Sequence, residues 1–241
     1  GAKATIFDGD EGPMTGGMGV VCPTPVLDAT PLSSGEPWFI GCKSQGGAQR
    51  DSWAGIRVDD FRIYNKAITA SEVSAIASAG GITATGPGLL GQWKFDEGTG
   101  VSVADQSTYN NPIQIYCTDG SGLNPNQTGS GCPYALPAWY PGHTGATTDK
   151  SLEFNFWQYG VVPSTVLDGK LTNQITISAW VKKRLSNQNV KWWIHQQKGA
   201  NSIADLMGIW VNAGGKMSFE LDGFALSLIH ISEPTRLRRI S

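Results

Sequence analysis

Residues 55–76 read GIRVDDFRIYNKAITASEVSAI, and this stretch predicts a strand, a pair of carboxylates and a capped helix in succession. Successive side chains of a strand point to opposite faces, so the two apolar residues of IRV share one face. In a regular strand the two apolar residues of FRI would lie on the other face. A β-bulge at Asp59-Asp60 adds one residue and so returns all four apolar side chains to the same side. We therefore expect one of the two aspartates to be turned out of the strand ladder.

A short helix is expected directly after this strand. Thr69 and Glu72 have the spacing of a capping box, in which each side chain accepts a hydrogen bond from the backbone N–H of the other residue. The helix should cover about residues 70–78 and stop at Gly80-Gly81.

Residues 56–76 resemble the closing strand and terminal helix of laminin G-like, concanavalin A-type lectin/glucanase modules. LLGQWKFDEGTGVSVADQSTYNNPIQI (89–115) resembles the opening strands of the same family, and KSLEFNF (150–156) and QITISAWVK (174–182) resemble two of its later strands. The resemblance implies an all-β fold, a two-sheet antiparallel β-sandwich of the jelly-roll type, with one short helix near residues 70–78.

The order of these matches predicts how the chain is divided. Residues 1–79 correspond to the closing strands and helix of one module, 80–88 to a linker, and 89–225 to the N-terminal part of a second module. The first and last strands are neighbours in this family, so we expect residues 56–64 to pair antiparallel with residues 90–95. The two parts would then close into one sandwich, whereas a longer natural protein would hold complete modules in tandem.

Charge and composition disfavour nucleic-acid and membrane partners. Residues 226–241 contain LSLIHISEPTR, which resembles the in-frame translation of a sequencing-library adapter, and we expect a non-native tail there; the alternative is a real edge strand with a basic tail. The 241-residue chain has a net charge of −2, and removing the tail, with its three arginines and one glutamate, leaves −4. The basic cluster disappears with the tail, and a basic face is what nucleic-acid binding requires. No apolar run approaches the length of a bilayer span, so membrane insertion is not expected.

The cysteines predict disulfides and an oxidising compartment. None of them forms a C-x-x-C pair, and His143 and His195 lie far from them in sequence, which disfavours a zinc site. Of three possible connectivities we expect the local one, Cys22–Cys42 and Cys117–Cys132; buried free thiols are the alternative. Disulfides favour a secreted or cell-surface location. Residues 117–149 are expected to form a long excursion outside the sheets.

The family resemblance implies a structural calcium ion where the opening and closing segments meet. Calcium takes 6–8 oxygen ligands, including backbone carbonyls, and a Gly-rich loop beside two acids supplies them. Asp60 and Asp105 are the strongest candidates. The alternative is that these acids cap turns and face water. The full candidate set is Asp59, Asp60, Asp96, Asp105, Asn110 and Asn111.

Carbohydrate binding is the second expectation that follows from the family. Aromatic faces stack on sugar rings, and polar groups fix the orientation of the sugar. The candidate residues are Trp180, Trp192 and Trp193; Trp157 and Tyr159 also lie near expected turns, and packing between the sheets is the alternative for each.

No catalytic pattern is present in the sequence. Related hydrolases carry E-x-D-x-E on one strand, and SFELD (218–222) lacks the first acid. H-E-x-x-H, G-x-S-x-G and P-loop motifs are also missing. We expect a non-catalytic extracellular binding or adhesion module, with an extracellular glycan or a cell-surface protein as its partner, from a larger secreted protein. The alternatives are an accessory module of a glycoside hydrolase or other polysaccharide-degrading enzyme, and a structural spacer.

Overall fold

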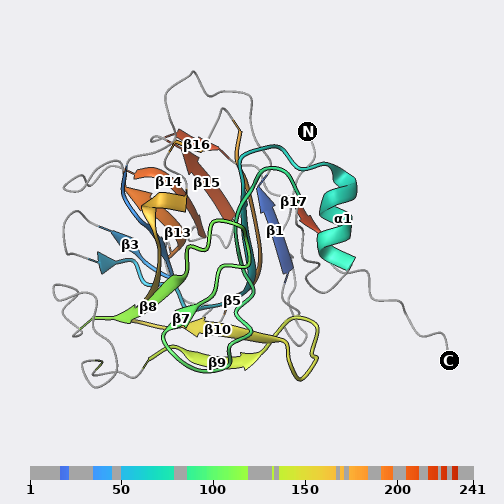
Figure 1. Ribbon diagram of the computed structural model, residues 1–241. Helices are drawn as coiled ribbons and strands as arrows, with labels where there is room; N and C mark the ends of the chain where they lie inside the picture. Colours follow the sequence, from blue (N-terminus) through green and yellow to red (C-terminus); the bar gives the residue numbers. More distant parts are fainter. Residues whose placement is uncertain are drawn as a thin grey trace, which may run out of the picture.

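The computed structural model describes residues 17–21, 35–44, 50–78, 86–118, 132, 136–166, 169–170, 174–183, 191–197, 205–211, 217–221, 224–226 and 230–232. In this part of the chain the strands form two large antiparallel sheets packed face to face, and helix α1 (Ala70–Ser78) lies on the outer side of one of them (Figure 1). The expected all-β antiparallel sandwich with one short helix is confirmed.

The first sheet has the order β17-β1-β12-β5-β10-β9, with β6 also paired to β5. Its strands are β1 (Gly17–Val21), β5 (Ile56–Tyr64), β6 (Leu89–Trp93), β9 (Ala138–Pro141), β10 (Lys150–Phe154), β12 (Thr176–Lys183) and β17 (His230–Ser232). The origin of the tail that contains β17 stays a prediction.

The second sheet has the order β16-β15-β14-β13-β2-β11-β8-β7. Its strands are β2 (Trp38–Ile40), β7 (Ser102–Val103), β8 (Ile113–Cys117), β11 (Gln158–Val162), β13 (Lys191–Gln197), β14 (Asp205–Val211), β15 (Met217–Leu221) and β16 (Phe224–Leu226). A separate small ladder joins β3 (Lys43–Ser44) to β4 (Arg50–Asp51), and Ser164–Val166 forms a 3-10 turn.

The bulge in β5 is confirmed. Ser178 of β12 lies opposite Arg62, but Trp180, two residues further on, lies opposite Asp59, so β5 contains one extra residue. Asp60 has a φ of 50°, the left-handed conformation that lets a strand take up an additional residue. As expected, the four apolar side chains of IRV and FRI all enter the core between the sheets.

β5 changes partner at this bulge. On one edge it follows β12 throughout, but on the other edge residues 56–58 pair with β10 and residues 61–64 pair with β6. Phe61 lies opposite Trp93 of β6, so the expected pairing across the linker is confirmed for residues 61–64, whereas residues 56–58 pair with β10 instead. The division of the natural protein into modules stays a prediction.

Two clusters of buried side chains flank the first sheet. The core between the sheets contains several large aromatic side chains, and Trp38, Phe61, Trp93 and Phe154 are all fully buried. Burying such a side chain contributes about 1.5–3 kcal/mol. On the outer face, α1 covers residues that alternate with the core residues. This second cluster consists of Tyr64, Ile68, Ile76, Leu89 and Trp180.

The capping box of α1 is also confirmed. The Glu72 N–H donates to Thr69 Oγ1 over 3.2 Å, and the Thr69 N–H donates to Glu72 Oε2 over 2.7 Å. Lys66 Nζ lies 2.6 Å from Glu72 Oε1. This contact with Lys66, followed by the Thr69 N–H bond, lowers the pKa of Glu72 to about 2. The predicted stop at Gly80-Gly81 lies outside the described residues.

Thr69→Ala is expected to lower the free energy of unfolding by about 1 kcal/mol at neutral pH, because it removes the cap. The pKa of Glu72 is lower in the folded protein, so its contribution is present above pH 4.5 and is lost as the pH falls toward 2. Urea unfolding at pH 7 and pH 3 measures both effects. Ser74→Ala, at an exposed helix position, is the control. An equal loss in both variants would rule out a capping role for Thr69.

The segment before β10 corrects one expectation. Residues 138–141 do not lie outside the sheets, because β9 pairs with β10 at the edge of the first sheet. The guanidinium carbon of Arg57 lies 3.6 Å from the ring centroid of Tyr140, which helps to hold this edge strand. The expected Cys117–Cys132 disulfide is present, with a Cα–Cα distance of 5.7 Å. Cys42 is buried, and Cys22 lies outside the described residues, so the Cys22–Cys42 pairing stays a prediction.

Candidate functional site

A buried polar group surrounds the bulge on the outer face of the first sheet. Asp60 Oδ2 lies 2.7 Å from Arg62 Nη2, and the two side chains are 2% and 0% exposed. Assigning the Gln92 amide of β6 with its oxygen toward Arg62 satisfies both groups, because that oxygen then accepts from Nε at 3.2 Å and from Nη2 at 3.1 Å. Burial raises the pKa of Asp60, against the opposing charge of Arg62. Removal of either side chain would leave the other as an unpaired buried charge. Asp60 and Arg62 are therefore tolerated in this position only as a pair.

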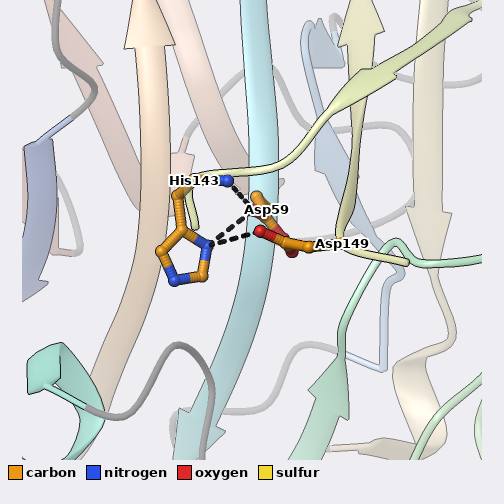
Figure 2. A group of neighbouring side chains, drawn as sticks. All are labelled: Asp59, His143 and Asp149. Atoms are coloured by element: carbon orange, nitrogen blue, oxygen red, sulfur yellow. Dashed lines mark hydrogen bonds and ion pairs between the residues drawn. The ribbon is translucent and has the colours of Figure 1, made fainter. Parts of the chain in front are cut away.

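Asp59 binds His143 on the other side of the bulge (Figure 2). Asp59 Oδ2 accepts the His143 backbone N–H at 2.8 Å and lies 2.7 Å from ring Nδ1. The imidazole also stacks on Trp180, with ring centroids 4.4 Å apart and planes 13° apart. Asp149 Oδ2 lies 4.0 Å from the same Nδ1. Two carboxylates and one imidazole therefore converge within a small volume.

The loop of residues 142–149 carries His143 and Asp149 to this place. The Thr144 N–H donates to Asp149 Oδ2 at 2.7 Å, and the Thr144 hydroxyl donates to the same oxygen. A Cβ at position 142 would overlap the Asp149 carboxylate, so this tight turn requires Gly142. Leu152 of β10 lies opposite Val58, and the loop that precedes β10 therefore reaches the level of Asp59.

Asp59 and His143 titrate as a pair. Burial raises the pKa of Asp59, although its hydrogen bonds from His143 act in the other direction. Burial of the His143 ring opposes its charged form, but the hydrogen bond and charge of Asp59, with Asp149 and Asp60 nearby, outweigh it and raise the pKa of His143. Both raised pKa values favour a proton held between the Asp59 carboxylate and the His143 ring. Because the two groups are coupled, this proton is assigned to the pair and not to either residue alone.

The predicted calcium ligands do not form one ligand set. Both oxygens of Asp105 already accept hydrogen bonds, from the Gln92 and Ser107 N–H groups, the Ser107 hydroxyl and the Asn111 N–H, at 2.7–2.9 Å. Four donors shared between both oxygens are the surroundings of a turn-capping carboxylate, and they leave neither oxygen open to a cation.

The remaining candidates are equally occupied or lie elsewhere. Asp96 accepts the Lys150 N–H at 3.0 Å, and the Asn111 carbonyl accepts from the Trp93 indole at 2.8 Å. Asn110 is an exposed residue with a φ of 51°. Of the residues predicted as ligands, Asp59 alone belongs to a described group of three His, Cys, Asp or Glu side chains with ligand atoms within 4.8 Å, and its partners are His143 and Asp149. Calcium binding by the chain stays a prediction.

The tryptophans predicted to stack on sugar are placed differently. Trp180 is 7% exposed in the cluster under α1, and Trp193 is 7% exposed in the core between the sheets. Trp192 lies on β13, and its side chain is outside the described part of the chain. Burial leaves Trp180 and Trp193 without an open aromatic face, so both serve packing.

A different aromatic cluster lies on the outer face of the second sheet, and we call it the aromatic patch. Its rings contact one another at centroid distances of 5.4–6.2 Å, in tilted arrangements. Tyr116 and Trp157 are only partly buried, and the neighbouring Phe156 is 41% exposed. The aromatic patch consists of Phe39, Trp53, Tyr116, Trp157 and Tyr159.

Sequence reasoning missed both His143 and Asp149. His143 was considered only in relation to the cysteines, and residues 142–149 were expected outside the sheets. The signal available was GHTGATTD itself, a Gly- and Thr-rich turn that ends in a carboxylate able to accept from a preceding N–H.

Comparison with protein-family models, curated proteins and solved structures finds no match for this chain. Among the described helices, none has the length and apolar character needed to cross a membrane.

Proposed function

We propose that this chain is a non-catalytic extracellular binding module of laminin G-like, concanavalin A-type architecture, and that its ligand is carbohydrate. The observation that carries the proposal is the aromatic patch. Tyr159 and Phe39 alternate with core residues of β11 and β2, so their rings face away from the other sheet. Those two rings are themselves buried, and they support the partly buried rings of Tyr116 and Trp157. The exposed parts of Tyr116 and Trp157 offer apolar faces for the C–H groups of a sugar and polar atoms for its hydroxyls.

The backbone at Trp157 also supports this assignment. Trp157 has a φ of 69°, which is unusual for a bulky side chain. Such a conformation costs of order 1–3 kcal/mol and is concentrated at functional sites, where the surrounding structure maintains it. Here the contact between the Trp157 and Trp53 rings, with centroids 5.4 Å apart, maintains it at the edge of the patch. The strained backbone and the partial exposure of Trp157 together mark it as the residue of the patch to test first.

The Cys117–Cys132 disulfide supports an oxidising, extracellular location. An adhesion module and an accessory module of a polysaccharide-degrading enzyme would use the same patch, and the domains that adjoin the module would distinguish them. A structural spacer would use no patch at all.

Trp157→Ala is expected to weaken carbohydrate binding about tenfold or more, which corresponds to about 1.4 kcal/mol. Affinity electrophoresis and calorimetry with soluble β-glucan, xylan, mannan and sulfated galactan would identify the ligand and measure the loss. Tyr109→Ala, an aromatic residue that is 44% exposed and outside the patch, is the matched control and should bind as the unaltered protein does.

Three outcomes of this experiment are decisive. Loss of binding in Trp157→Ala alone, with the circular dichroism spectrum unchanged, supports the proposal. Unaltered binding in Trp157→Ala would remove the aromatic patch from the assignment. Binding to none of the polysaccharides would favour the spacer.

A further inference from the structure

The convergence of Asp59, His143 and Asp149 belongs to a different part of the molecule from the aromatic patch. The three residues lie on the outer face of the first sheet, around strand β5 and the loop before β10 (Figure 2). One ligand atom from each, two carboxylate oxygens and one imidazole nitrogen, lies within 4.8 Å of the other two. Nothing in a carbohydrate-binding role for the aromatic patch requires this group.

The three side chains are held in place by other contacts. His143 is fixed by its own backbone N–H, which donates to Asp59, and by the flat stack of its ring on Trp180. Asp149 is fixed by the N–H and hydroxyl of Thr144. Contacts of this kind orient metal ligands before the ion arrives, and they reduce the ordering cost of binding.

Local charge favours a cation at this place. Asp59, Asp60 and Asp149 contribute three carboxylates. Among the described side chains, Arg62 supplies the permanent positive charge that acts on Asp60. Asp59 and Asp60 are 4% and 2% exposed, and burying charge that is not compensated is costly. A divalent ion beside a neutral imidazole would bring the net charge of the group to zero, whereas a proton on His143 leaves one negative charge.

The donor set selects the class of metal. Calcium takes oxygen ligands, usually six to eight, and an imidazole is not among them. One imidazole with two carboxylates suits zinc and related first-row transition metals, with metal–ligand distances of about 2.0–2.2 Å. We propose that Asp59, His143 and Asp149 form a binding site for a divalent transition-metal ion of the zinc class. Three protein ligands leave one position of a tetrahedral ion for water or another small ligand.

The test is calorimetric titration of the full chain, freed of metal by chelator, with Zn²⁺, Mn²⁺ and Ca²⁺ in turn. We expect one Zn²⁺ per chain, with Ca²⁺ unable to displace it. His143→Gln and Asp149→Asn should each weaken Zn²⁺ binding about tenfold or more, which corresponds to about 1.4 kcal/mol. His230→Gln, which alters a histidine on β17, is the matched control and should bind Zn²⁺ normally.

Electron paramagnetic resonance with Cu²⁺ as the probe supplies a readout that does not depend on comparing stabilities. The spectrum of the unaltered protein should show coupling to a single imidazole nitrogen, and His143→Gln should abolish it. Should the His143 variant fail to fold, the one-nitrogen spectrum of the unaltered protein and its loss in Asp149→Asn still decide the matter. No saturable Zn²⁺ binding, Zn²⁺ binding unchanged in both ligand variants, or preferential binding of Ca²⁺ would overturn the proposal. Trp157→Ala should leave Zn²⁺ binding intact, so the metal site and the carbohydrate proposal can fail independently.

Discussion

Phe61→Ala is expected to lower the free energy of unfolding by about 3–5 kcal/mol. Phe61 of β5 and Trp93 of β6 are both fully buried, and their rings stack with centroids 5.2 Å apart and planes 21° apart. The alanine variant would leave a cavity between the sheets and would also remove an aromatic pair worth about 0.5–1.5 kcal/mol beyond its burial. Phe61 and Trp93 lie on either side of the linker in sequence. The loss therefore measures how much their contact stabilises the pairing of β5 with β6.

Guanidinium unfolding of Phe61→Ala, Trp93→Ala and the double variant measures the coupling between the two rings. Gly91→Ala is an independent check, because a Cβ at Gly91 would overlap the Trp93 ring and force it to move. Tyr109→Ala, at an exposed position, should change stability by only about 0.5 kcal/mol. A Phe61→Ala protein as stable as the unaltered one would show that β5 and β6 are not joined in the folded protein.

Arg62→Met is the second substitution with a large expected effect, about 3–5 kcal/mol. It removes the guanidinium 2.7 Å from Asp60 and leaves a carboxylate that is 2% exposed without its counter-charge. Asp60→Asn should also be destabilising, although asparagine tolerates the φ of 50° at this position. The double variant should lose less than the sum of the two single losses, because neither member of the Asp60–Arg62 ion pair remains without its partner.

Denaturant unfolding monitored by circular dichroism measures this cycle at constant pH and salt. Lys66→Met removes the cation from a comparable ion pair with Glu72, whose side chains are 30% and 39% exposed. An exposed pair contributes about 0–1 kcal/mol, so this variant is the matched control. Equal losses for Arg62→Met and Lys66→Met would show that the ion pair at the bulge is open to solvent.

Several local features could be predicted because their causes lie within a few residues. The opposite parity of IRV and FRI requires a bulge if all four apolar side chains are to be buried, and the bulge occurs at Asp59 and Asp60. The spacing of Thr69 and Glu72 predicts the cap, and both hydrogen bonds of that cap are formed. The expected pairing of residues 56–64 with the opening strand depended on the family resemblance; it is formed by residues 61–64, whereas residues 56–58 pair with β10.

The candidate metal group could not be predicted in the same way. His143 and Asp59 are 84 residues apart, and no local pattern connects them. Trp180, one of the tryptophans predicted to stack on a sugar, lies on the face of β12 directed away from the core. Helix α1 covers that face, and Trp180 is buried in the cluster beneath it.

The sequence by itself therefore determined the position of the bulge and the start of the helix, because side-chain parity and capping act between near neighbours in the chain, and it indicated the class of fold through the family resemblance. The tertiary structure decided where the acidic residues act. Pairing of β10 with β5 sets the loop of residues 142–149 beside the bulge, and Asp59 receives His143 there. That meeting depends on strand register and on burial beneath a distant loop, which are properties of the assembled sheet and not of any one segment.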